Sequence, residues 1–386
     1  MTKPIESTSP AVSQQYENNF ETPRSTEPAT SDGNSSYSTV TTQSLPDLVS
    51  GVSLTKASKP LSSDRLYAKE QLLQYVSEIP GAPSNLAETH PTLMTALAKI
   101  KFDKNAWYLG SPTATRVIVA IPGAPVDANY LVPFFERVQD KLNDSSTAFL
   151  LLPSAEPRKI AKAIDALKST QAVAHIGFFT HSGGSITVHR MQNMGLLPEE
   201  TESFAAEAWV EGGSYQPRPD AAYKPEKLDW EPSPALPQNR GIATSSKKQL
   251  AALSRYYFPE DLWNDPECRT AMLQVLDKMR IIGVGPLLSE LLYMTFHKRS
   301  DKALVALQNS DIKILAFSGL DEQVVMPMHS EQAFATAIGK TISAIPDAEY
   351  WTDGENIWAP LPNTRHMPMF EMADEMADIY ADFLVH

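Results

Sequence analysis

The chain has 386 residues, 42% of them hydrophobic, which fits one large domain with an insertion, or two domains. Its formal net charge of −13 at pH 7 argues against a nucleic-acid partner, because binding to a phosphate backbone requires clustered Lys and Arg. The single cysteine, Cys268, excludes an internal disulfide and a Cys-based metal site.

The first 50 residues contain ten Ser, eight Thr and five Pro. Such a segment buries too little apolar surface to offset its ordering entropy, so residues 1–60 are predicted to form a disordered tail. Its composition also resembles the secretion signals of bacterial type III effectors, which makes a delivery or regulatory tail the second interpretation. The start of the chain lacks a basic n-region and an apolar h-region. We therefore expect a cytoplasmic protein, with export that needs no Sec signal as the alternative.

No run of the sequence reaches the roughly 18–20 consecutive apolar residues that span a bilayer, so no transmembrane segment is expected. Apolar residues three and four apart predict a helix over residues 65–76 and a second helix over residues 90–101. The Pro-Gly-Ala-Pro run at 80–83 separates the two.

From about Asn105 onward, short apolar segments alternate with amphipathic ones. This pattern predicts a mostly parallel sheet covered by helices on both faces, with the chemistry at the carboxyl ends of the strands. The predicted strands are 107–109, 116–121, 147–152, 172–179, 206–210 and 312–317, and the predicted helices are 130–142, 156–167, 330–338 and 369–384.

The strand that ends at Phe179 runs directly into Thr180-His181-Ser182-Gly183-Gly184. A strand, a turn with serine and glycine, and a helix together form the context of a nucleophile elbow. Thr180 departs from the glycine that is usual at that position. The competing interpretation is a glycine-rich helix start with Ser182 as its N-cap.

Two further loops carry the remaining candidates for acyl-transfer chemistry. Asp321 follows the strand 312–317 and can fix the tautomer of a histidine, while the neighbouring Glu322 ranks lower. His366 lies in a loop just before the last helix. The order Ser182, Asp321, His366 is the order Ser, Asp, His of one serine-hydrolase lineage.

An oxyanion hole is expected from two backbone N–H groups. One belongs to Gly183, directly after the serine. The other belongs to Ala124, in the tight Pro122-Gly123-Ala124-Pro125 turn after the strand 116–121.

With these motifs, the chain from about Asn105 to its end resembles the α/β-hydrolase superfamily. The resemblance implies an eight-stranded, mostly parallel sheet flanked by helices in a domain over 61–386. It also implies a helical lid, at about 213–309, inserted after the sixth strand. No metal or organic cofactor is implied.

The function expected from this resemblance is hydrolysis of a carboxylic ester, lipid or small acyl ester, through an acyl-enzyme on Ser182. An iminopeptidase-like amidase of the same fold is one alternative. It would use an acidic surface near the lid, where Glu202, Glu207 and Glu211 are expected to be solvated. A non-catalytic binding or receptor protein is the other alternative, and the departures at Thr180 and Pro122 favour it.

Overall fold

The computed structural model describes residues 63–81, 84–123, 126–210, 257–278, 301–322, 324–325, 327–342 and 350–385. The chain divides into two units, Met1–Ser44 and Leu45–His386, and every described residue belongs to the second. The predicted tail at 1–60 lies outside the described residues, as does most of the predicted lid at 213–309.

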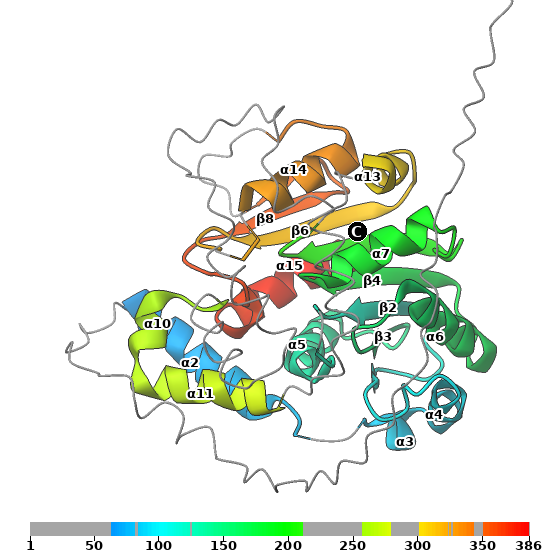
Figure 1. Cartoon of the computed structure of the whole chain (residues 1–386), viewed down its shortest axis with the longest axis horizontal. Coiled ribbons are helices and arrows are strands. Elements are labelled where there is room, and N and C mark those ends of the chain that lie inside the picture. Colours follow the sequence, from blue (N-terminus) through cyan, green and yellow to red (C-terminus); the bar gives the residue numbers. More distant parts are fainter. Residues whose placement is uncertain are drawn as a thin grey trace, which may run out of the picture. The chain divides into compact units, whose positions relative to one another are not determined.

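Eight strands form one sheet in the order β1-β3-β2-β4-β5-β6-β8-β7 (Figure 1). The six inner strands are parallel, and the edge strands β1 and β7 are antiparallel to their neighbours. The expected eight-stranded, mostly parallel sheet is therefore confirmed. The strands are β1 (Trp107–Leu109), β2 (Arg116–Ile121), β3 (Thr147–Leu151), β4 (His175–His181), β5 (Thr201–Glu207), β6 (Lys313–Gly319), β7 (Trp351–Thr352) and β8 (Ile357–Leu361).

Helices cover both faces of the sheet, and a separate apolar cluster lies between each face and its helices. On one face lie α2 (Ser63–Glu78), α5 (Val132–Leu142), α11 (Pro266–Lys278) and α15 (Ala373–Val385). On the other face lie α3 (Leu86–Thr89), α4 (Pro91–Ala98), α6 (Pro157–Thr170), α7 (Gly184–Asn193), α13 (Asp301–Gln308) and α14 (Pro327–Ile338). Short α10 (Glu260–Asn264) precedes α11, and the 3-10 turns η1 (Asn129–Leu131) and η2 (Pro368–Phe370) precede α5 and α15.

Strand β2 shows why the inner strands are apolar at every position. Val117, Val119 and Ile121 face one cluster, whereas Ile118 and Ala120 face the other, and all five are fully buried. A strand with helices on both sides has no solvated face, so alternation with polar residues is lost.

Two strand boundaries differ from the prediction. Strand β4 continues through Thr180 and His181, which the sequence placed in the turn. Strand β5 covers Thr201–Glu207 rather than 206–210, because the backbone turns at Ala208 with φ of +47°. The polar start of β5 hid it, although Ser203 is buried against Gly177 of β4.

In the described part of the chain the interruption of the alternation follows β5, and a lid after the sixth strand is not confirmed. Among the described residues only one antiparallel strand, β1, precedes β2, and the eighth strand comes from the other edge as β7. Helix α13, which lies within the expected lid range of 213–309, packs on α7 and α14 as part of the layer over the sheet.

The described part of the insertion contains α10 and α11, which lie beside α2, about 200 residues earlier in the chain (Figure 1). Cys268 and Met272 of α11 are buried in the same cluster as Leu72 and Tyr75 of α2. This part of the insertion therefore belongs to the packed core.

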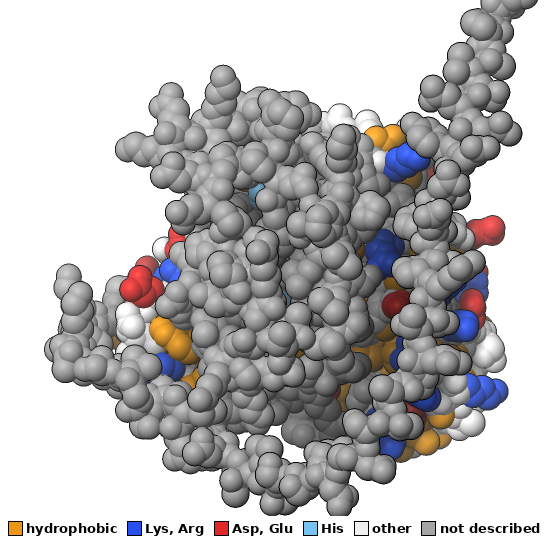
Figure 2. All heavy atoms as spheres, in the orientation of Figure 1, with side chains coloured by type: hydrophobic (Ala, Val, Ile, Leu, Met, Phe, Trp, Pro, Cys, Tyr) orange, Lys and Arg blue, Asp and Glu red, His pale blue; other side chains and the backbone are white. Residues whose placement is uncertain are grey.

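On the face drawn in Figure 2, acidic and basic side chains of the described residues are interspersed at the periphery. None of the described helices combines the length and apolarity needed to span a membrane.

Candidate active site

Ser182 occupies a strained turn between β4 and α7. Its φ is +52°, in the left-handed region that residues with a Cβ rarely adopt. The conformation is held from both sides: the N–H of Ser182 donates to the Glu207 carbonyl at 2.9 Å, and the N–H of Ser185 donates to the Ser182 carbonyl at 3.1 Å. The Ser182 side chain remains half-buried, which is the exposure that a nucleophile elbow requires.

Gly184, two residues after the serine, has no room for a side chain. A Cβ on Gly184 would lie 2.2 Å from the Ile121 carbonyl oxygen, so the start of α7 touches the end of β2. Thr180, the departure from the family pattern, is accommodated because its buried hydroxyl donates to the Ala205 carbonyl at 3.3 Å.

The loop after β2 lies directly against the serine. A Cβ on Gly123 would be 3.2 Å from the Ser182 Cβ and 3.6 Å from the Gly183 nitrogen. The Gly183 N–H is thus next to this loop, as an oxyanion hole requires. Ala124, the second expected donor, lies outside the described residues.

His366 pairs with Glu322 and not with Asp321. Its Nδ1 lies 2.7 Å from Glu322 Oε2, and both side chains are almost completely buried. The other carboxylate oxygen of Glu322 accepts the Val324 N–H at 2.6 Å. Asp321, the expected acid, is exposed.

The way the turn after β6 is held explains why Glu322, and not its neighbour Asp321, pairs with His366. The N–H groups of Leu320 and Asp321 donate to the carbonyls of Leu361 and Thr364, which holds the turn against the loop after β8. A Cβ on Gly319 would lie 2.4 Å from the Arg365 carbonyl oxygen, so only glycine permits this approach. The next side chain to turn inward is that of Glu322.

The imidazole of His366 lies between two other rings. The His181 ring is 4.9 Å away, and the Tyr257 ring is stacked at 5.1 Å with an interplanar angle of 29°. Burial lowers the pKa of His366, but the Glu322 and Glu207 carboxylates outweigh it and raise that pKa above its ordinary value.

A second buried acid and histidine lie beneath the serine. His181 Nδ1 is 2.6 Å from the Tyr130 hydroxyl, and its Nε2 lies 2.9 Å from the His366 carbonyl oxygen and 2.8 Å from Glu207 Oε2. Because a carbonyl only accepts, Nε2 carries the proton and donates. His181 therefore connects the region of the β2 loop to the backbone of His366.

The expectation that Glu207 is solvated is wrong. Glu207 is fully buried, and burial raises its pKa despite the opposing charges of His181 and His366. Glu202 is half-buried between Arg116 at 2.6 Å and His175 at 2.8 Å, and Glu211 lies outside the described residues. The pairing register of β4 and β5 sets His181 opposite Glu207, a signal that the sequence pattern alone did not reveal.

Ser182, Glu322 and His366 follow the carboxyl ends of β4, β6 and β8, which are parallel and so end at one edge of the sheet. The described residues contain no group of three or more His, Cys, Asp or Glu side chains that could hold a metal ion.

No protein-family model matches the chain, and no curated protein is similar to it in sequence. Its structure is similar to a bromoperoxidase from Bacillus anthracis, with a TM-score of 0.50 at 14% identity over 73% of this chain and 95% of that one. An esterase (EaEST) from Exiguobacterium antarcticum gives a TM-score of 0.50 at 11% identity over 73% and 95%. Rv0554 from Mycobacterium tuberculosis gives 0.50 at 17% over 72% and 92%. The chain has the α/β-hydrolase fold, as the sequence resemblance predicted.

The contact at Gly184 predicts a loss of stability in Gly184→Ala. Because the added methyl group meets a backbone carbonyl, the free energy of unfolding should fall by about 1–3 kcal/mol, measured by urea denaturation. Gly81→Ala is the control, since nothing lies within 4 Å of its added Cβ. Equal stability of the two variants would contradict the close approach of α7 and β2.

The charge of Glu207 predicts a change in the titration of His366. In Glu207→Gln the pKa of the His366 imidazole should fall, because one of the carboxylates that raise it is neutralised. NMR titration of the histidine ring signals measures this value directly. Glu202→Gln should leave it unchanged, since Glu202 pairs with Arg116 and His175. An identical His366 titration in wild type and Glu207→Gln would show that the two groups do not interact.

Proposed function

We propose that the chain is a serine hydrolase that cleaves a carboxylic ester through an acyl-enzyme on Ser182. The observation that carries the proposal is the buried Glu322–His366 pair, at 2.7 Å, at the same sheet edge as a serine with φ of +52°. In this proposal Glu322 takes the role that was expected of Asp321.

In the first half of the reaction, the Ser182 hydroxyl attacks the ester carbonyl and His366 Nε2 accepts its proton. Glu322 accepts the Nδ1–H, which fixes the tautomer and stabilises the imidazolium without taking the proton. The N–H of Gly183, and that of Ala124 as expected from the sequence, bind the oxyanion. Each donor of this kind contributes about 10²–10³ in rate.

The imidazolium then donates its proton to the leaving alcohol, and the acyl group remains on Ser182. A water molecule deprotonated by His366 attacks the acyl carbonyl, which releases the acid and restores the serine. The burial of His366 and Glu322 supports these steps, because an ion pair that is excluded from water keeps a single geometry and its two charges interact strongly.

Two observations bear on the alternatives. The iminopeptidase-like alternative needs acidic groups free to bind a substrate amine, and Glu207 is fully buried beside His181 in the interior. The non-catalytic alternative rests on the departures at Thr180 and Pro122, and the hydrogen bond from the Thr180 hydroxyl to the Ala205 carbonyl accommodates the first of them. The esterase among the similar structures agrees with the ester proposal in reaction class.

A fluorophosphonate probe tests the nucleophile. The probe should label the wild-type chain at Ser182, and Ser182→Ala should be unlabelled, with ester hydrolysis reduced by about 10⁴-fold or more. Ser169→Ala, at an exposed helix position, is the control and should be labelled like wild type. Labelling that persists in Ser182→Ala would assign the nucleophile elsewhere.

The two candidate acids are separated by matched amide substitutions and a pH profile. His366 must be neutral to act as a base, and its pKa is raised, so kcat/KM should rise with pH through a midpoint above about 6.5. In Glu322→Gln the positive charge loses its partner, so the midpoint should move to lower pH while kcat falls by about 10²–10⁴-fold.

Asp321→Asn should retain both the rate and the midpoint, because Asp321 is exposed and contributes its backbone N–H to the Thr364 carbonyl. A loss in Asp321→Asn as large as that in Glu322→Gln would return the acid to Asp321.

A further inference from the structure

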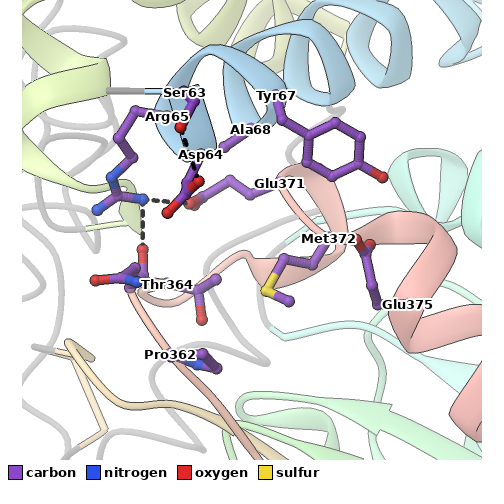
Figure 3. A pocket seen from close by; sticks show the side chains of 11 residues that line it. Ser63, Asp64, Arg65, Tyr67, Ala68, Pro362, Thr364, Glu371, Met372 and Glu375 are labelled. Atoms are coloured by element: carbon purple, nitrogen blue, oxygen red, sulfur yellow. Dashed lines mark hydrogen bonds and ion pairs between the residues drawn. The ribbon is translucent and has the colours of Figure 1, made fainter. Parts of the chain in front are cut away.

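A cavity of about 360 Å³ lies between the start of α2 and the segment that leads from β8 into α15. Figure 3 shows side chains of the α2 turn on one side and those of residues 362–375 opposite. None of Ser182, Glu322 and His366 lines it. Its size is that of a pocket for a small organic molecule and is far larger than the space around a single ion.

Glu371 lines this cavity with a carboxyl group that has no hydrogen-bond partner. Its side chain is 1% exposed, and neither of its oxygens accepts a hydrogen bond. A buried polar group without a partner destabilises a protein by about 1–3 kcal/mol, so native structures rarely contain one.

Glu371 has a long ion pair with Arg65, but this contact gives it no hydrogen bond. Arg65 Nη1 lies 3.8 Å from Glu371 Oε2, beyond hydrogen-bond distance. The same guanidinium binds Asp261 at 2.8 Å through Nε and the Asn363 carbonyl at 2.7 Å through Nη1. Burial raises the pKa of Glu371 well above its ordinary value, with Arg65 and Arg365 opposing that rise.

Two more carboxylates border the same space. Glu375, in the first turn of α15, has a buried Oε2 without a hydrogen bond, and Asp64 lies on the opposite wall. Between them lie the apolar surfaces of Tyr67, Ala68 and Met372 (Figure 3). Three carboxyl groups therefore border the cavity beside Arg65, whose guanidinium is committed to Asp261 and Asn363, and the apolar wall offers room for a hydrophobic body.

We propose that this cavity binds a small organic cation, an ammonium group carried on an apolar body. The ammonium nitrogen, with three donors and no acceptor, would bind the carboxylate of Glu371, and the apolar body would lie against Tyr67 and Met372. An anion would meet the carboxylates of Asp64 and Glu375, and a neutral molecule would bring no positive charge to stabilise the ionised form of Glu371. This proposal does not depend on the proposed hydrolase activity.

The test uses the full chain and three probes of one shape: 2-phenylethylammonium, 2-phenylethanol and phenylacetate. Isothermal titration should show saturable binding of the ammonium and at least tenfold weaker binding of the alcohol and the carboxylate. Glu371→Gln should weaken binding of the ammonium by tenfold or more. Glu70→Gln makes the same change on an exposed residue of α2 outside the cavity and should bind like wild type.

An NMR titration of the wild-type chain locates the bound probe without any substitution. On titration with 2-phenylethylammonium, the NMR signal of the Met372 methyl group should shift, and that of Met94, on the opposite face of the sheet, should not. This readout decides the matter if Glu371→Gln does not fold. Equal affinity for the alcohol, unchanged affinity in a folded Glu371→Gln, or no shift of the Met372 signal at saturating ammonium would each overturn the proposal.

Discussion

The left-handed backbone of Ser182 is the constraint on which the rest of the site depends. A serine at φ of +52° is unfavourable by about 1–3 kcal/mol unless its surroundings hold it there. The surroundings here are the end of β5, which accepts the Ser182 N–H, and the end of β2, against which Gly184 packs without a side chain. Both strand ends are in place because the inner strands are parallel and their carboxyl ends meet at one edge.

The same edge of the sheet also contains two buried carboxylates. Glu207 and Glu322 are both removed from water, and each has a histidine within 2.8 Å. A buried carboxylate is tolerated where a partner compensates for its lost hydration, and removal of the partner leaves an expensive uncompensated charge. The two pairs are linked, because His181 donates to the backbone of His366 while both carboxylates act on the His366 ring. The position of the candidate base thus depends on two strand ends besides its own loop.

The features that depend only on nearby residues were predictable from the sequence. Apolar strands, amphipathic helices and the serine–glycine turn at Ser182 depend on neighbours within a few residues. The choice between Asp321 and Glu322 does not, because it is set by hydrogen bonds to Leu361 and Thr364, about 40 residues later. The pairing of His181 with Glu207 follows from the register of two strands. The cavity at Glu371 forms between residues 63–68 and 362–375, which are far apart in the sequence. Such contacts are properties of the tertiary structure, which no local pattern encodes.

Mass spectrometry can show whether Ser182 carries the acyl group during turnover. The chain is mixed with p-nitrophenyl acetate, quenched in acid within the first turnovers, digested and analysed by peptide mass. We expect an acetyl group on the peptide that contains Ser182, present during turnover, absent once the ester is consumed, and never formed in Ser182→Ala. Rapid hydrolysis by the wild-type chain with no acetyl group on Ser182, or with one on another residue, would contradict the proposed acyl-enzyme.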